Sequence, residues 1–135
     1  MSGAVYFAIS DSQELRDLGV ENVLSDYEGE LISRDSLTVI LRWGSQNYQR
    51  VVRTGPRDLD IWVHMPAELG TDFTMINRVL NEITKIIESI GEEPGPDGIS
   101  VTEAVKVGAS GNIHDPGFNS FTRNCSYRVQ LAEMV

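Results

Sequence analysis

The sequence has little of the chemistry on which most small catalytic sites depend. It holds one cysteine and two histidines among 135 residues. One cysteine cannot form an internal disulfide, so a reducing compartment is expected. The acidic residues, 20 against 11 lysines and arginines, give a formal charge of −9. This balance argues against tight, sequence-independent binding to nucleic acid, which needs many cationic contacts with phosphates.

Long hydrophobic runs are also missing. No apolar stretch approaches the roughly 18 residues of a membrane-spanning helix, and the start, Met1-Ser2-Gly3, lacks the basic residues of a signal peptide. What is present is an ordinary globular composition, with 41% apolar and 23% charged residues. A chain of this size buries enough surface to fold as one domain without a metal or a disulfide. We therefore expect a single domain over residues 1–135, with no cofactor, no metal and no membrane contact.

Several segments alternate between apolar and polar residues, as half-buried strands do. Residues 37–43 place Leu37, Val39, Leu41 and Trp43 on one side. In residues 57–64 the apolar side is Leu59, Ile61 and Val63, and the other side is Asp58, Asp60, Trp62 and His64. In residues 99–109 it is Ile99, Val101, Val105 and Val107, and in residues 121–132 it is Phe121, Cys125, Tyr127, Val129 and Leu131. Residues 49–53 are also strand-like, and residues 110–120 are expected to be a polar loop.

Residues 72–90 predict a long amphipathic helix. Its apolar positions fall within an arc of about 100° when the residues are spaced as in a helix. They are Phe73, Ile76, Leu80, Ile83, Ile87 and Ile90. Thr71 or Asp72 is the expected N-cap, and Gly91 the expected end.

The N-terminal third is less regular. Residues 4–9 favour a helix, and a second turn through Leu15 and Leu18 is capped by Asp11 or Ser12 and ended by Gly19. Residues 20–27 suit either a short strand or an irregular edge. The predicted fold is α+β: an antiparallel sheet of four to five strands, one long amphipathic helix on one face and a short N-terminal helix.

The histidines are the first candidates for a site. Zinc needs three or four ligands at compatible spacing, but His64 and His114 are 50 positions apart with no ligand pair at helical spacing. A serine–histidine–aspartate triad remains open, because its members need not be adjacent in sequence. We favour surface or loop positions for both histidines. Asp58 and Asp60 share a strand face and suit either acid–base chemistry or, as we favour, an exposed edge that resists strand pairing.

Two other candidates have simpler interpretations. Cys125 falls on the apolar face of its strand, where a buried thiol behaves as a small hydrophobic group rather than a nucleophile. Residues Gly108–Gly111 resemble a phosphate-binding turn only loosely, since they lack the Gly-Lys-Ser/Thr ending. We interpret them as a loop.

Charge is distributed unevenly along the chain. Residues 11–35 carry eight acids and two bases, whereas residues 42–57 carry four arginines and no acid. Two solvated surfaces would explain this pattern, and so would a head-to-tail contact in which the arginines of one subunit meet the acids of the next. The candidate interface residues are Arg42, Tyr48, Arg50, Arg53, Arg57, Glu21, Asp26, Glu28 and Glu30. A protruding hairpin arm at about residues 44–57 would present the arginines.

The order of the predicted elements suggests a family. The motif Arg57-Asp-Leu-Asp-Ile-Trp-Val-His64 precedes the long helix, and His114-Asp-Pro-Gly117 leads into Tyr127-Arg-Val-Gln-Leu131. Over nearly its full length the chain resembles the tail terminator proteins of long-tailed phages, of the lambda minor tail protein U type. The resemblance implies a structural protein without enzymatic activity, found in the virion tail and, during assembly, in the host cytoplasm.

In that family a homohexameric ring caps the tail tube, ends polymerisation of the tube protein and offers a surface to the head connector, or stopper, protein. DNA passes through the ring without specific binding. Two alternatives stay open. One is a head-closure or head–tail joining connector protein, and the other is a small cytosolic hydrolase-like enzyme that uses His64 or His114 with Asp58, Asp60 or Asp115.

Overall fold

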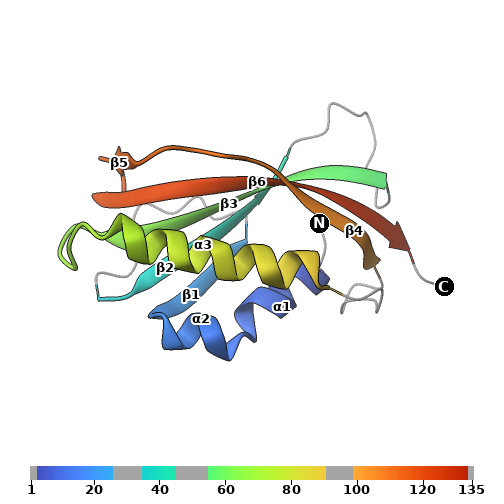
Figure 1. The fold of residues 1–135 in the computed structure, drawn as a ribbon, viewed down its shortest axis with the longest axis horizontal. Helices are drawn as coiled ribbons and strands as arrows, with labels where there is room; N and C mark the ends of the chain where they lie inside the picture. The colour runs from blue at the N-terminus through green and yellow to red at the C-terminus, as the bar shows by residue number, and fades with distance from the viewer. Residues whose placement is uncertain (1–2, 26–34, 45–54, 91–98, 134–135) are drawn as a thin grey trace.

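The computed structural model of the protein describes residues 3–25, 35–44, 55–90 and 99–133. Three helices lie together on one side of a sheet (Figure 1). The helices are α1 (Gly3–Ser10), α2 (Gln13–Asp17) and α3 (Phe73–Glu88). The strands are β1 (Val20–Ser25), β2 (Leu37–Trp43), β3 (Gly55–Pro66), β4 (Ile99–Ala109), β5 (Ile113–Asp115) and β6 (Ser120–Glu133). The α+β class is confirmed.

The sheet has the order β1-β2-β3-β6-β4, and β5 pairs with β6 along the same edge as β4. All the pairs are antiparallel except β1 with β2, which run parallel. We expected an antiparallel sheet of four to five strands. Within the described residues the sheet has six strands, and one of its pairs, β1 with β2, is parallel. Side chains alternate in the same way in both kinds of pair, so the sequence pattern carries no signal of strand direction.

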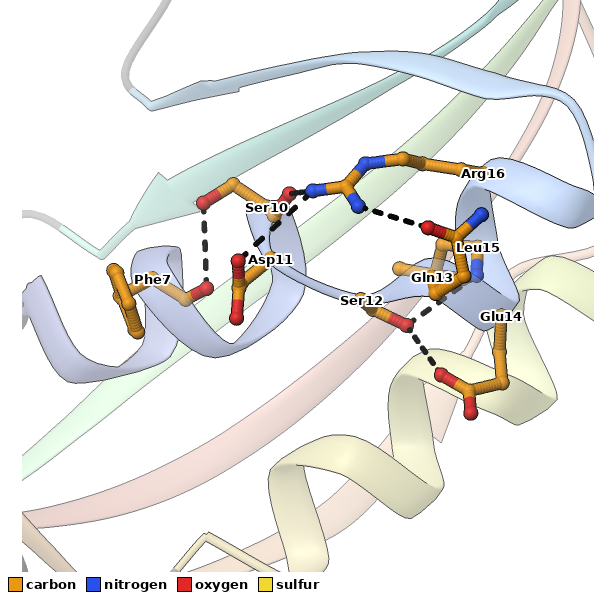
Figure 2. Close-up of polar contacts among 8 residues, drawn as sticks. All are labelled: Phe7, Ser10, Asp11, Ser12, Gln13, Glu14, Leu15 and Arg16. Carbon is orange, nitrogen blue, oxygen red and sulfur yellow. Dashed lines mark hydrogen bonds and ion pairs between the residues drawn. The ribbon is translucent and has the colours of Figure 1, made fainter.

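The corner between α1 and α2 is held by local hydrogen bonds (Figure 2). Ser12 is the N-cap of α2, and its side chain accepts a hydrogen bond from the backbone N–H of Leu15 at 3.3 Å. Arg16 donates to the carbonyl of Ser10 at 3.1 Å and to the side chain of Gln13 at 3.2 Å. These contacts turn the chain so that both short helices reach the sheet, and they confirm the predicted capping by Ser12.

Helix α3 forms because its apolar residues recur at helical spacing and its first turn is capped. The side chain of Asp72 accepts from the backbone N–H of Met75 at 3.0 Å. The buried residues of the helix are Ile76, Val79, Leu80, Ile83 and Ile87. Each such side chain contributes about 1.5–3 kcal/mol when it leaves water. The predicted stripe is confirmed, with Val79 added to it.

Strand β6 provides much of the surface on which α3 packs. Cys125, Tyr127, Val129 and Leu131 are all buried on this side, as the alternation predicted. The hydroxyls of Tyr127 and Thr84 lie 2.7 Å apart, so the one polar atom of the tyrosine has a partner on the helix. Burial raises the pKa of Tyr127. This side of the sheet is the hydrophobic core of the molecule.

Strand β4 does not follow its predicted face. Val101 is buried, but Val105 and Val107 are 41% and 58% exposed. The register shifts between Val101 and Glu103 and again between Lys106 and Gly108. Each irregularity adds one residue and moves the following side chains to the other face. The prediction of one shared face for Ile99, Val101, Val105 and Val107 is therefore wrong at Val105 and Val107.

The remaining predictions concern connections. Residues 20–25 form a strand, which decides between the two expectations for residues 20–27. The loop expected at residues 110–120 contains β5. The strand-like residues 49–53 and most of the hairpin arm expected at about residues 44–57 fall on residues 45–54, outside the described residues. Residues 55–57 belong to β3 and pair with β6, so they are part of the sheet and not of a protruding arm. At the base of the expected arm, the backbone N–H of Gly44 donates to the carbonyl of Asp58 at 2.7 Å, so β2 and β3 remain paired there.

Candidate functional site: the open face of the sheet

The side of the sheet away from the helices is the main candidate surface. We call it the open face, because all three described helices lie on the other side (Figure 1). It is formed by the even-numbered residues of three strands that lie directly opposite one another. They are Thr38, Ile40 and Arg42 of β2, Asp58, Asp60, Trp62 and His64 of β3, and Ser120, Thr122, Asn124, Ser126 and Arg128 of β6. Its two ends have different chemistry.

One end of the open face is charged. Arg42 lies opposite Asp60 in the ladder between β2 and β3, and Ser126 donates a hydrogen bond to Asp60. Arg128 reaches Asp58 at 3.5 Å, with both side chains largely exposed. Exposed pairs of this kind are worth about 0.2–1 kcal/mol, so they stabilise the fold little. The favoured role of Asp58 and Asp60 in protecting a sheet edge is wrong, since β3 lies between β2 and β6.

The other end of the open face is polar but buried. His64 is 3% exposed, and its Nδ1 lies 2.8 Å from the Oγ of Ser120. The ring of Phe118 meets the imidazole edge-on, with 4.9 Å between the ring centres. Thr122 donates from its hydroxyl to the carbonyl of Val63 at 2.7 Å. The buried hydroxyl of Thr38, directly opposite His64, has no hydrogen-bond partner among the residues that the structure describes.

Burial controls the protonation of His64. It lowers the pKa of the imidazole from 6.5 to about 4, and the nearby carboxylate of Asp115 opposes this effect only in part. The ring is therefore neutral at physiological pH. The expectation that both histidines lie at the surface is wrong for His64 and right for His114, which is exposed. The strand alternation missed the burial of His64, because its cover comes from a segment about 50 residues later.

β5 pairs with the edge of β6, and the turn that follows it carries Phe118 to His64. Asp115 shapes the turn by accepting from the backbone N–H groups of Gly117 at 2.9 Å and Phe118 at 3.2 Å. Asn119 completes the turn with a positive φ of 50°, a conformation that asparagine tolerates better than most residues. The turn places Phe118 over His64. Asp115 and His64, which the sequence left as separate candidates, are thus brought to the same region.

A serine hydroxyl beside a neutral imidazole is a pairing used in nucleophilic catalysis. Here Ser120 is fully buried and His64 almost so. A substrate cannot reach the Oγ of Ser120 while the turn covers the pair. In this conformation the contact therefore stabilises the fold rather than presenting a nucleophile.

The candidate interface residues are only partly described. Arg42 is exposed on the open face, and Glu21 is exposed on β1. Arg57 lies on the helix side, because it is opposite Val129 of β6, and its guanidinium sits 5.8 Å from the ring centre of Trp43. The two described arginines of the basic zone therefore occupy opposite faces. The remaining candidates, Tyr48, Arg50, Arg53, Asp26, Glu28 and Glu30, lie outside the described residues.

An open groove of about 400 Å³ runs between α2 and α3. Its charged lining comes from Glu14 and Asp17 on α2 and from Arg78, Glu82 and Lys85 on α3. Lys85 lies 3.7 Å from Glu82. Two acids of residues 11–35, Glu14 and Asp17, thus face bases of the same subunit. Among the candidate interface acids, the structure describes Glu21, which does not line this groove.

The other sequence candidates have structural roles. Cys125 is buried in the core, as predicted. The expectation of a loop at Gly108–Gly111 is wrong for its first half, because Gly108 and Ala109 are the last residues of β4. After the strand, the side chain of Ser110 accepts a hydrogen bond from the backbone N–H of Asn124 at 2.9 Å, and the carbonyl of Ser110 accepts from Arg123. Within the described ranges, no cluster of three or more histidine, cysteine or acidic side chains is arranged to hold a metal. Nor does any described helix have the length and apolar character needed to cross a membrane.

No protein-family model matches the sequence, and no curated protein matches it significantly. The resemblance to tail terminators therefore stays a prediction.

Proposed function

We propose that the chain is a structural phage tail protein of the tail terminator type. Its subunits form a ring, with six the number that the resemblance implies. The ring caps the tail tube, ends polymerisation of the tube protein and joins the tube to the head connector, while DNA passes through the centre without specific binding. The protein acts by assembly and catalyses no reaction.

The order of elements supports this proposal. A helical N-terminus, the antiparallel pair β2 and β3, a long amphipathic helix and the final pair β4 and β6 follow one another along the chain. This is the order on which the resemblance rests. Fold alone does not determine function, so the proposal also needs a surface suited to contacts between subunits.

The charge on the strand pair β1–β2 carries the proposal. Glu21 is exposed beside the first residues of β2, and Arg42 is exposed near the last. Leu37 and Arg42 are five steps apart along the strand, which is about 17 Å at the usual rise per residue. A subunit with an acid at one end of this pair and an arginine at the other suits a head-to-tail contact, and such contacts close into rings when the rotation permits.

A charge exchange tests the contact. Arg42→Glu and Glu21→Arg each place like charges at a head-to-tail interface, so each variant alone should remain monomeric in native mass spectrometry. Mixed in equal amounts, the two variants restore opposite charges at every contact when they alternate around the ring. We expect the mixture to form rings with an even number of subunits, visible by negative-stain imaging.

The control is Arg78→Glu, a charge reversal at an exposed position of α3. It should assemble as the unchanged protein does. Rings formed by Arg42→Glu alone would contradict the proposed contact. If the unchanged protein is monomeric alone, the same comparison is made with polymerising tube subunits encoded by the same genome. Tubes of unchanged length in the presence of the unchanged protein would contradict the terminator role itself.

The same materials distinguish the two alternatives. A connector protein would bind portal–adaptor complexes rather than tube ends. A hydrolase would cleave generic ester or phosphoester substrates, and that activity would disappear in Ser120→Ala and His64→Ala. The contact between Ser120 and His64, both of which are buried, makes this a specific test.

A further inference from the structure

Residues 113–119 form a small cover on the open face, which we call the β5 flap. It is attached to the sheet through three ladder positions, at which Ile113, His114 and Asp115 lie opposite Thr122, Phe121 and Ser120. Beyond the ladder, the carbonyl of Asn119 accepts from the backbone N–H of Ala67 at 3.0 Å. The side chain of Asn119 also donates to Glu68 at 3.4 Å, and the ring of His114 contacts that of Phe121. The ladders between β1, β2, β3, β4 and β6 do not include these contacts, so the segment can open without unfolding the sheet.

The flap has an identifiable pivot at each end. Gly111 and Asn112 are exposed just before it, and a Cβ at Gly111 would meet no atom within 4 Å. Asn119, at the other end, already has a positive φ. The strands on either side are long and paired. Movement would therefore concentrate at these two points.

The flap contributes to the burial of His64. Phe118 packs against the imidazole from the flap, and Ser120 contacts its Nδ1 from the first residue of β6. The result is a histidine that is 3% exposed on a face whose other end is charged. Lifting Phe118 would remove the ring that packs edge-on against the imidazole, while leaving the helix-side core untouched.

The groups that face His64 offset a positive charge on its ring only in part. From β2 it faces the hydroxyl of Thr38, and from β6 the hydroxyls of Ser120 and Thr122. On its own strand the nearest ring is Trp62, 6.4 Å away between centres. From the flap come Phe118 and the carboxylate of Asp115, which is the one charged group acting on His64 among the described residues. Its attraction is smaller than the cost of burial.

We propose that the β5 flap is released by acid, because a proton on His64 makes the closed position unfavourable and the open, hydrated position favourable. The closed ring titrates with a pKa of about 4, and a hydrated ring with a pKa near 6.5. The open form therefore binds more protons than the closed form between these values. The opening constant should rise about tenfold for each pH unit below 6.5 and level off near pH 4, for a total of about 300-fold.

Release of the flap would have a chemical consequence. Ser120 and His64 would both become accessible to solvent and to any partner that approaches the open face. The two side chains would thus be buried when the flap is closed and exposed when it is open. This inference does not depend on the proposed function, since it concerns one segment of a single subunit.

Amide hydrogen exchange between pH 6.5 and 4.5 tests the proposal. After correction for the intrinsic pH dependence of exchange, protection of the amides in residues 113–119 should fall about tenfold per pH unit. Amides of the central strands, such as that of Leu41, should keep their protection. Flap protection that does not change with pH would overturn the proposal.

The matched control is His64→Gln, which keeps a polar side chain but cannot take up a proton in this range. Its flap should show no such dependence, and an equal dependence in this variant would assign the effect to carboxylates and overturn the proposal. If His64→Gln does not fold, the imidazole of the unchanged protein is titrated by NMR. A pKa below 5 for His64 supports the closed flap, and a value near 6.5 contradicts it.

Discussion

The two faces of the sheet differ in the chemistry of their side chains. The helix-side face is mostly apolar and is closed by α3, and the buried hydroxyl of Tyr127 on it is paired with Thr84. The open face has charged pairs at one end and buried hydroxyls and an imidazole at the other. It also contains the buried hydroxyl of Thr38, which has no hydrogen-bond partner within the described part of the chain.

We infer that the helix-side face contributes most of the stability, and that the open face contributes polar and charged groups whose effects depend on their partners. Apolar burial is non-directional and adds up over many contacts. Buried polar groups depend on geometry, and a missing partner costs about 1–3 kcal/mol. Substitutions on the two faces should therefore differ in size and, at one position, in sign.

The largest effect is expected on the helix side, at Ile83, which is fully buried in α3. Ile83→Ala should lower the free energy of unfolding by about 2–5 kcal/mol, because it removes apolar contacts and leaves a cavity. Asn81→Ala, at an exposed position of the same helix, should change it by less than about 0.5 kcal/mol. Urea denaturation measures both. A loss below about 1 kcal/mol at Ile83 would mean that α3 does not pack as described.

The next effect appears at high pH. The folded pKa of Tyr127 lies above the ordinary value of 10.0, so the unfolded chain loses its proton first. Stability contributed by this group is complete below pH 10 and should fall by about 1.4 kcal/mol per pH unit above it. Tyr127→Phe should lack this slope when unfolding is measured between pH 9 and 11. Parallel pH profiles for the two proteins would refute the burial of the hydroxyl.

The open face should show a change of sign between two threonines. Thr122→Val removes a hydroxyl that donates to Val63, and should cost about 1 kcal/mol. Thr38→Val removes a buried hydroxyl that has no partner in the described ranges, and should stabilise the protein by about 1 kcal/mol. Thermal and urea unfolding of the pair would show the contrast. Equal losses in both variants would mean that the hydroxyl of Thr38 is satisfied in solution.

The smallest effect is expected at the charged end. Arg128→Ala breaks the exposed pair with Asp58 and should cost less than about 1 kcal/mol. Salt at about 1 M should remove most of this difference, since it screens exposed charges within a few ångströms. Unfolding in low and high salt gives the comparison, and a larger loss that resists salt would point to a buried role for Arg128.

Elements whose signal is local could be predicted from the sequence. The stripe of α3, the alternation of β3 and β6 and the cap at Ser12 each depend on spacing within one segment. The reversal in β4 could not be predicted, because a bulge at Thr102 or Val107 depends on how β6 pairs with it. The parallel direction of β1 was missed for a similar reason.

The candidate site was predicted only in its parts. His64, Asp115, Asp58 and Asp60 were all candidates, but their grouping depends on which strands are neighbours. Both histidines were expected at surface or loop positions. The flap invalidates that expectation at His64, because Phe118 covers it from a distant part of the chain.

The central position of β6 has a consequence for how the protein forms during synthesis. This strand follows every other described element in the sequence, yet β3 on one side and β4 on the other both bond to it. Until the ribosome has released it, β3 has an open hydrogen-bonding edge and α3 lacks much of its platform. Folding must then proceed through late, non-local pairing, which is slow and leaves unpaired strands exposed to aggregation.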